Sequence, residues 1–200
     1  ILCQSFNFNV KRKKRGSFLH EKTIEQILSH ARSSFKEKYL GKTLSWSQEA
    51  SFNRGSFATI LGLIDHGSTI EIFSVGDSVA VWNQNDRLTM LSMHNDYNFN
   101  KKPTLLSTLC SEKESFFPNF GKDWDVKKLK KKEIKNAELF LLTDAVASRI
   151  IEISIQNTVD DAINILKKND QELKAWINKE KNSGLLKKDD YTIVWVELNE

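Results

Sequence analysis

The chain has 200 residues, of which 40% are hydrophobic, 28% are charged and only two are proline. This composition is typical of one folded domain and excludes a disordered chain, and no apolar run is long enough to span a membrane. The net charge of +4 is too small to require a nucleic-acid partner. Cys3 and Cys110 are too few for a disulfide framework, so we expect a protein of the reducing cytoplasm. Because the sequence begins at Ile1, we expect further residues upstream.

Three amphipathic helices are predicted in a single domain that spans residues 1–200. Residues 1–20 form an N-terminal basic segment whose run Lys11–Arg15 we interpret as a solvated loop, and residues 21–200 form the domain body. Apolar residues recur at helical spacing in three stretches. These predicted helices are residues 21–39, 158–166 and 170–179.

The remaining elements are predicted to be strands. Alternating or continuous apolar runs bounded by turn residues indicate residues 56–64, 69–75, 79–82, 87–91, 126–134, 139–143 and 191–198. The first two flank the turn-like residues 65–68 and predict a hairpin, and residues 83–86 predict another turn. Lysines at 127, 128, 130, 131, 132 and 135 are typical of an edge strand, whereas residues 139–143 are apolar enough to be central. The order of elements predicts an α+β fold.

Acidic residues stand at the ends of three of these apolar runs, in residues 74–82, 138–146 and 188–196. Several acidic strand ends at one edge of a sheet form an oxygen-rich pocket, which suits hard divalent cations such as Mg²⁺ or Mn²⁺. The alternative is structural: Asp144 caps a following helical segment, Asp189 and Asp190 lie in a turn, and Asp77 forms a turn. For Asp77 we favour the turn.

Four segments together resemble the type 2C family of metal-dependent serine/threonine protein phosphatases. They are Gly55-Ser56-Phe57-Ala58-Thr59, Val75-Gly76-Asp77-Ser78, Leu141-Leu142-Thr143-Asp144-Ala145 and Asp189-Asp190-Tyr191-Thr192-Ile193-Val194. The resemblance runs from about residue 52 to residue 198. It implies an α-β-β-α sandwich of two antiparallel sheets flanked by helices, lacking its first strands. A missing upstream segment or a partner chain would complete the sheet.

The resemblance also implies the chemistry. In the family, the aspartates at the positions of Asp144 and Asp189 coordinate a pair of Mg²⁺ or Mn²⁺ ions, and the one at Asp77 lies near a third, weaker metal site. Two such ions about 3.5–4 Å apart activate a bridging water for attack on phosphate. The substrate implied is a phosphoserine or phosphothreonine in a protein, with neither a membrane nor a nucleic acid as partner.

The sequence departs from the family at several positions. No Asp-Gly-x-Gly-Gly segment, whose aspartate bridges both metals, stands in residues 1–20, and without it the two ions would bind weakly. Ala145 replaces a glycine, Val79 replaces a common arginine, and Phe57 stands in place of a threonine. The alanine is acceptable if the backbone there has a negative φ. These departures leave a second hypothesis open, a catalytically inactive phosphatase-like binding module.

Other residues are given structural interpretations. The four histidines, His20, His30, His66 and His94, have no partners at metal-ligand spacing and are predicted to lie at the surface. Trp82 and Trp195 alternate with apolar residues on strands and are predicted to be core residues. A third hypothesis, nucleic-acid binding by the basic runs, is the least favoured, because those runs have no aromatic residues between them.

Overall fold

The structure of the chain is a computed structural model that describes residues 21–91, 105–108 and 125–198, without the side chains of residues 21–28. Within these residues the fold is α+β, with five α-helices and three small antiparallel sheets of two, three and four strands. The predicted fold class is therefore confirmed at this level. No helix of the described residues is long and apolar enough to cross a membrane. The basic segment of residues 1–20 lies outside the described residues.

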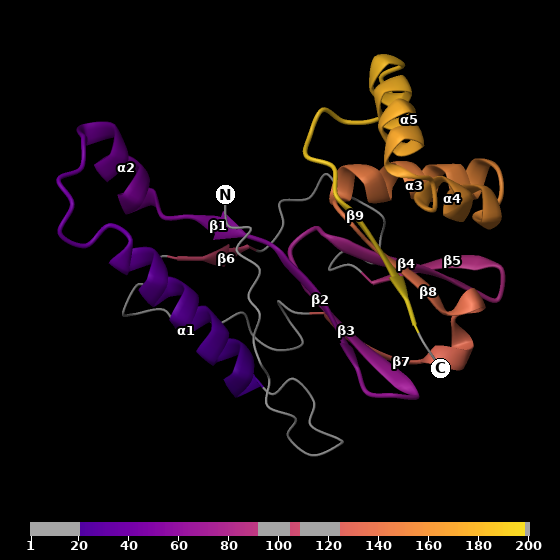
Figure 1. The fold of residues 1–200 in the computed structure, drawn as a ribbon, viewed down its shortest axis with the longest axis horizontal. Helices are drawn as coiled ribbons and strands as arrows, with labels where there is room; N and C mark the ends of the chain where they lie inside the picture. The colour runs from indigo at the N-terminus through magenta and orange to yellow at the C-terminus, as the bar shows by residue number, and fades with distance from the viewer. Residues whose placement is uncertain (1–20, 92–104, 109–124, 199–200) are drawn as a thin grey trace.

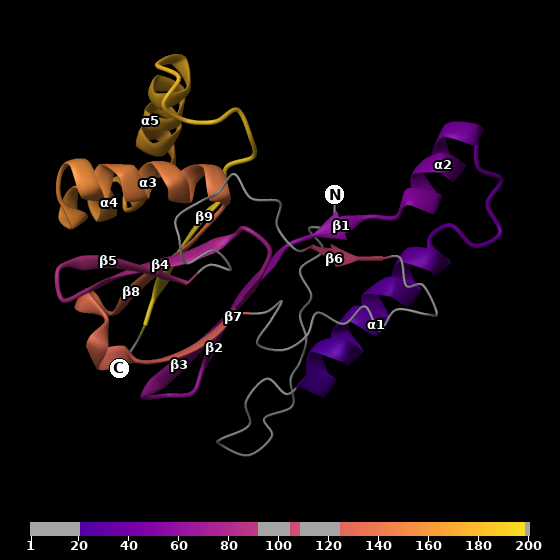
Figure 2. The ribbon, with the colours of Figure 1, turned by 180° about the vertical axis from the view of Figure 1, so that it is seen from behind.

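Two helices at the beginning of the described chain lie to one side of the larger sheets (Figures 1 and 2). Helix α1 (Glu21–Glu37) confirms the first predicted helix, and Gly41, at a φ of +71°, follows it. Helix α2 (Trp46–Arg54) was not predicted from the sequence. The side chain of Arg32 on α1 donates a hydrogen bond from Nε to the Ser107 carbonyl at 2.9 Å, which ties α1 to strand β6 (Leu106–Ser107).

The three-stranded sheet has the order β2-β3-β7. Strands β2 (Ile60–Asp65) and β3 (Thr69–Val75) form the predicted hairpin. The predicted strand over residues 56–64 is wrong in part, because β1 (Phe57–Ala58) pairs instead with β6 (Leu106–Ser107). Strand β7 (Asp125–Lys130) lies at the sheet's edge, as its lysines predict.

Two short 3₁₀ helices follow β7 where the sequence predicted that the strand would continue. They are η1 (Lys131–Glu133) and η2 (Lys135–Ala137). Lys131 is only 9% exposed, although its position in a lysine-rich run predicted an exposed side chain. The strand prediction for residues 126–134 is therefore correct only as far as Lys130.

The four-stranded sheet has the order β5-β4-β8-β9. Its strands are β4 (Val79–Gln84), β5 (Arg87–Leu91), β8 (Glu138–Leu142) and β9 (Ile193–Glu197). Strand β8 is internal, which confirms its prediction as a central strand. The turn before β5 is tighter than predicted: only Asn85 and Asp86 form it, both with positive φ, which a type I′ hairpin requires.

Three helices belong to the C-terminal half: α3 (Asp144–Gln156), α4 (Val159–Leu166) and α5 (Asp170–Asn182). Helices α4 and α5 confirm the two predicted helices. Their starts are capped as their sequences indicate, because the side chains of Thr158 and Asn169 accept hydrogen bonds from backbone N–H groups of the first turn. Helix α3 was not predicted, apart from the possibility that Asp144 caps a helical segment.

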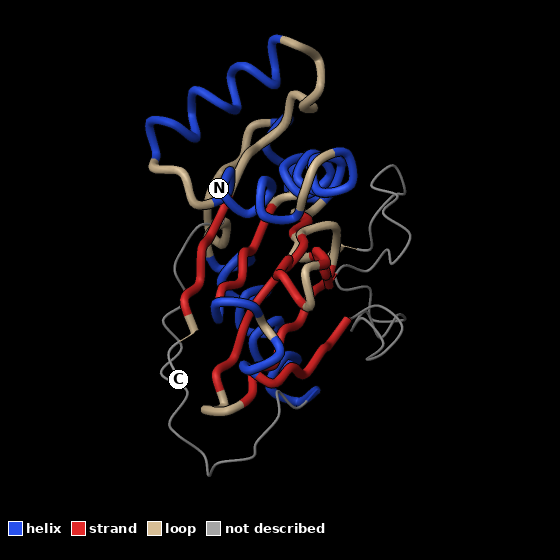
Figure 3. The backbone as a smooth tube through the Cα atoms, turned by 90° about the vertical axis from the view of Figure 1, so that its right-hand side faces the viewer, coloured by secondary structure: helices blue, strands red, loops and turns tan. Residues whose placement is uncertain are grey.

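The hydrophobic core has two parts, one on each face of the four-stranded sheet. Val79 and Val81 of β4 pack with residues of α3 and α4, whereas Ala80 and Trp82 pack with residues of β3 and β7. Alternate residues of a strand point to opposite faces, so one strand serves both parts. Seen from the side, the strands occupy the middle of the molecule (Figure 3).

The two tryptophans predicted to be core residues differ. Trp82 is fully buried, which confirms the prediction. Trp195 is 41% exposed, so the prediction is wrong for this residue. Trp195 lies on the edge strand β9. Its ring stacks on that of Phe140, with ring centroids 6.2 Å apart, and the ammonium group of Lys167 lies over it.

Candidate metal-binding edge

The strand register brings the three acidic segments to one edge of the four-stranded sheet. Val79 at the start of β4 pairs with Leu142 at the end of β8, which pairs with Ile193 at the start of β9. These three paired residues form a row across the sheet. Asp77 stands two residues before Val79 in the chain, and Asp144 stands two residues after Leu142. Asp189 is farther away, four residues before Ile193. We call this region, with its three aspartates, the acidic edge.

Two threonines join the end of β8 to the start of β9 beyond the last strand pair. The backbone N–H of Thr143 donates to the carbonyl of Thr192 at 3.2 Å, and the backbone N–H of Thr192 donates to Thr143 Oγ1 at 3.2 Å. Thr143 is also the residue that precedes α3. Its carbonyl accepts the N–H of Ala147 in the first turn of α3 at 2.9 Å, so Thr143 joins the start of the helix to the start of β9.

Asp144 is the first residue of α3, and its side chain is partly buried. The backbone N–H groups and the dipole of a helix favour a negative charge at this end, so an ionised Asp144 is in a favourable position without any metal. The N-cap of α3 is Thr143, so the interpretation of Asp144 as the capping residue is wrong; Asp144 is a first-turn residue, a position compatible with a ligand role.

Asp189 lies in an exposed loop that closes on itself. Its carboxylate Oδ1 accepts a hydrogen bond from the backbone N–H of Asp190 at 2.8 Å, and its own N–H donates to the Tyr191 hydroxyl oxygen at 3.4 Å. The Tyr191 hydroxyl in turn donates to the Lys187 carbonyl. Asp190 is exposed as well.

Asp77 lies in the β3–β4 turn, which is held by two contacts. The Ser74 hydroxyl donates to the Ser78 carbonyl at 3.0 Å, and the Ser78 hydroxyl lies 3.1 Å from Thr59 Oγ1. Gly76 has a φ of +102°, and a Cβ placed there would lie 2.4 Å from Cγ2 of Thr59. Only glycine fits this backbone and this space, so the turn holds Asp77 at the edge.

The carboxylates of the described residues do not form a closed metal site. No group of three or more His, Cys, Asp or Glu side chains that could hold an ion converges in the described ranges. Mg²⁺ is commonly held by one or two carboxylates, with water and substrate phosphate as its other ligands. A single carboxylate, such as that of Asp144 at the start of α3, can be the protein's share of such sparse coordination, whereas a closed pair of ions needs converging carboxylates that the described ranges do not show.

The three departures from the phosphatase pattern have clear structural settings. Ala145 lies inside α3, 2% exposed and outside the residues with positive φ, so an alanine is accommodated there. Val79 is fully buried among the residues between the sheet and α3 and α4, where an apolar side chain suits the packing. Phe57 is 57% exposed on the short strand β1, away from that core.

The residues that sequence reasoning missed are the hydroxyl groups. Thr143, Thr192 and the pair formed by Thr59 and Ser78 organise the acidic edge. A threonine directly before an aspartate at a strand end is a possible signal for the first of these. Nothing in the sequence indicates that Thr59 would meet Ser78, because this contact joins the residue between β1 and β2 to the distant β3–β4 turn.

The two histidines that the structure describes, His30 and His66, contribute no metal ligand to the acidic edge. His66 is not a free surface residue, because its Nε2 lies 3.2 Å from Oε2 of the buried Glu71 in the three-stranded sheet. His30 is exposed on α1. His20 and His94 lie outside the described residues.

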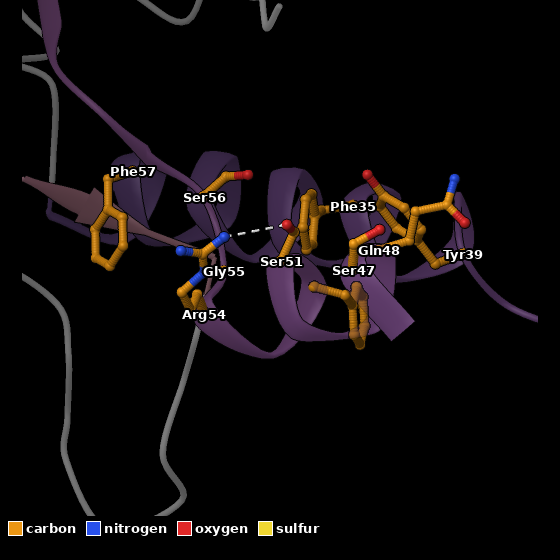
Figure 4. Close-up of a pocket in the computed structure, with 10 residues that line it drawn as sticks. Phe35, Tyr39, Ser47, Gln48, Ser51, Arg54, Gly55, Ser56 and Phe57 are labelled. Carbon is orange, nitrogen blue, oxygen red and sulfur yellow. Dashed lines mark hydrogen bonds between the residues drawn. The ribbon is translucent and has the colours of Figure 1, made fainter. Parts of the chain in front are cut away.

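A separate cavity of about 610 Å³ lies between α1 and α2 (Figure 4). The rings of Phe35 and Phe52 stack in it with centroids 5.6 Å apart, and the Arg54 guanidinium donates to Ser51 Oγ at 3.2 Å. No carboxylate is among its lining residues, so this cavity does not contribute to a cation site.

Comparisons with known proteins add no assignment. No protein-family model matches the chain, and no match is found among curated proteins.

Proposed function

We propose that the chain is part of a metal-dependent serine/threonine protein phosphatase, which hydrolyses phosphoserine or phosphothreonine on proteins in the cytoplasm. The observation that carries the proposal is the row Val79, Leu142 and Ile193, because it sets acidic segments of three strands at one edge of a sheet. The order and spacing of the four segments that resemble the family support the same function.

In this proposal Asp144 and Asp189 hold the ion, and Asp77 contributes to a weaker site. When bound, Mg²⁺ or Mn²⁺ supplies an activated water and offsets the negative charge of the phosphate. The chain's own task is to hold the carboxylates. The Thr143–Thr192 bonds fix Asp144 relative to the start of β9, and the contact of Ser78 with Thr59 fixes the turn that carries Asp77.

The proposal includes an α-β-β-α sandwich as the complete architecture. Two described contacts support it: α3 and α4 pack on one face of the four-stranded sheet, and the three-stranded sheet packs on the other. We further propose that an upstream segment or a partner chain supplies the first strands and the missing carboxylate. A phosphoprotein is the substrate.

The test is Mn²⁺ binding by calorimetry, together with Mn²⁺-dependent release of phosphate from a phosphothreonine peptide. We expect Asp144→Asn and Asp189→Asn each to weaken Mn²⁺ binding by more than about tenfold and to abolish phosphate release. Asp170→Asn is the matched control, because Asp170 is the first residue of α5 as Asp144 is of α3 and is exposed. The proposal would be refuted if the longest natural form of the protein bound no Mn²⁺, or if the variants bound it equally well.

A second candidate is a phosphatase-like binding module without catalytic activity. The observation that favours it is the Asp189 loop, where the carboxylate already accepts a hydrogen bond from its own loop and is exposed. The same assay separates the two candidates. Mn²⁺ binding that depends on Asp144 without any phosphate release, from the longest natural form of the protein as well, would favour the module.

A further inference from the structure

A large cleft lies at the other end of the sheets from the acidic edge. It has a volume of about 1290 Å³ and forms where the β2–β3 turn, the end of β7 and the helices η1 and η2 meet. Strand β8 separates the two sites. Helix η2, which lines the cleft, directly precedes Glu138 at the start of β8, whereas Asp144 of the acidic edge comes just after Leu142 at its end. In Figure 2 these short helices lie beside the end of β7, away from α3.

The lining of the cleft carries an excess of positive charge. Three lysines, Lys130, Lys131 and Lys132, stand against a single carboxylate, Asp65. Lys131 is 9% exposed and donates from Nζ to Asp65 Oδ2 at 2.9 Å, so these two groups neutralise each other. Burial raises the pKa of Asp65, but the hydrogen bond from Lys131 and that from the Gly67 backbone outweigh it and lower the pKa below its usual value. Asp65 therefore stays ionised.

The other two lysines of the lining, Lys130 and Lys132, are exposed, so their charges are accessible to a ligand. Lys130 Nζ lies 3.9 Å from Glu133 Oε1, in an exposed pair that contributes little. Protection of a sheet edge explains lysines within β7, such as Lys127, whose Nζ lies 5.0 Å from the centre of the Trp82 ring. It does not explain Lys131 and Lys132, because both lie in η1 after the strand has ended.

The remaining lining combines an apolar floor with polar groups at the rim. Ile134 is 4% exposed and Ala137 is partly buried, while Ser68 and Asn136 are exposed and can donate hydrogen bonds. The volume exceeds the roughly 300–1,000 Å³ that small-molecule sites occupy. A peptide segment fits such a space better than a metabolite. Among the described residues no aromatic side chain lines the cleft, so they provide no stacking platform of the kind found in single-stranded nucleic-acid sites.

We propose that this cleft docks an acidic segment of a partner protein. Two carboxylates of the segment meet Lys130 and Lys132, and an aliphatic side chain between them covers Ile134. Ser68 and Asn136 donate to the peptide. This interaction is independent of the phosphatase proposal, because no residue of the acidic edge takes part in it.

The experiment measures binding to the full chain by fluorescence anisotropy. The probe is a fluorescein-labelled peptide with alternating glutamates around a central leucine, and its control replaces every glutamate by glutamine. The cleft variant is Lys130→Glu/Lys132→Glu. The matched control is Lys168→Glu/Lys174→Glu, which makes the same change in charge at exposed lysines near and on α5. Thermal unfolding of both variants verifies that they are folded.

We expect the acidic peptide to bind the wild-type chain and the α5 control alike, and the cleft variant about tenfold more weakly or not at all. Binding should weaken as salt rises, and the glutamine peptide should not bind. Equal losses in the two variants would overturn the proposal, since net charge alone would then explain binding. A duplex DNA or RNA that binds more tightly than the peptide and loses the same affinity in the cleft variant would also overturn it.

Discussion

Replacement of Gly76 by alanine should destabilise the protein through two separable effects. The backbone of Gly76 has a φ of +102°, which costs a non-glycine residue about 1–3 kcal/mol. The added Cβ would also lie 2.4 Å from Cγ2 and 2.8 Å from Cβ of Thr59, and forced overpacking of this kind costs about 1–3 kcal/mol. The expected loss in the free energy of unfolding is therefore about 2–6 kcal/mol, a large part of the stability of a domain.

Gly67 provides the control for the backbone effect. It has a φ of +87°, but no atom lies within 4 Å of the position that a Cβ would take. Gly67→Ala should therefore lose only the backbone part, about 1–3 kcal/mol. The assay is urea unfolding of the two variants, and a shift of the midpoint reports a change in stability as long as the m-value is unchanged.

A second substitution tests the steric effect directly. Thr59→Ser removes Cγ2 but keeps the hydroxyl group that meets Ser78. In the Gly76→Ala background it should restore part of the lost stability, because the closest contact is removed. The reasoning is refuted if Gly76→Ala costs no more than Gly67→Ala, or if Thr59→Ser does not improve it.

Two further predictions concern ion pairs. Glu180→Ala should lower the free energy of unfolding, measured with urea, by about 3 kcal/mol, because Glu180 and Arg149 are nearly buried and their Oε2 and Nε atoms lie 2.6 Å apart. Glu152→Ala, which removes an exposed partner of Arg149, should lower it by less than about 1 kcal/mol. Equal losses in the two variants would contradict this account. The lowered pKa of Asp65 means that its contribution is present above its unfolded pKa of about 3.9 and is lost as the pH falls through the lower folded value. The urea midpoint of unfolding should therefore fall less steeply with decreasing pH in Asp65→Asn than in the wild type. An unchanged pH dependence would show that the bond from Lys131 contributes nothing to stability.

Elements with a strong local signal could be predicted from the sequence. The β2–β3 hairpin follows from two apolar runs around a short turn, and α4 follows from periodic apolar residues after Thr158, a good N-cap. The central position of β8 follows from its continuous apolar side chains.

Elements decided by distant contacts could not be predicted. Helix α2 has no buried residue, so no apolar period marks it. Helix α3 carries apolar residues on several sides, because it packs on both the sheet and α4. Its sequence therefore lacks the regular alternation of apolar and polar residues that marks an amphipathic helix. Strand β1 leaves the hairpin to pair with β6, and Trp195 is exposed because no described strand pairs with the outer edge of β9.

For the acidic edge, the sequence provided the aspartates and the strands that carry them. It did not provide the hydroxyl groups that position them, because Thr143 meets Thr192 across 49 residues and Thr59 meets Ser78 across 19. Contacts of this kind depend on the register and packing of the folded chain.

Because both faces of the four-stranded sheet are buried, the two parts of the core are coupled in unfolding. Neighbouring residues of β4 pack into different parts of the core, so neither part can lose its packing without stripping one face of the same strand. The helical layer and the three-stranded sheet therefore melt together with β4 and β8 as one cooperative unit. Within it, the amide protons of these two strands exchange with solvent last, and only when the whole unit opens.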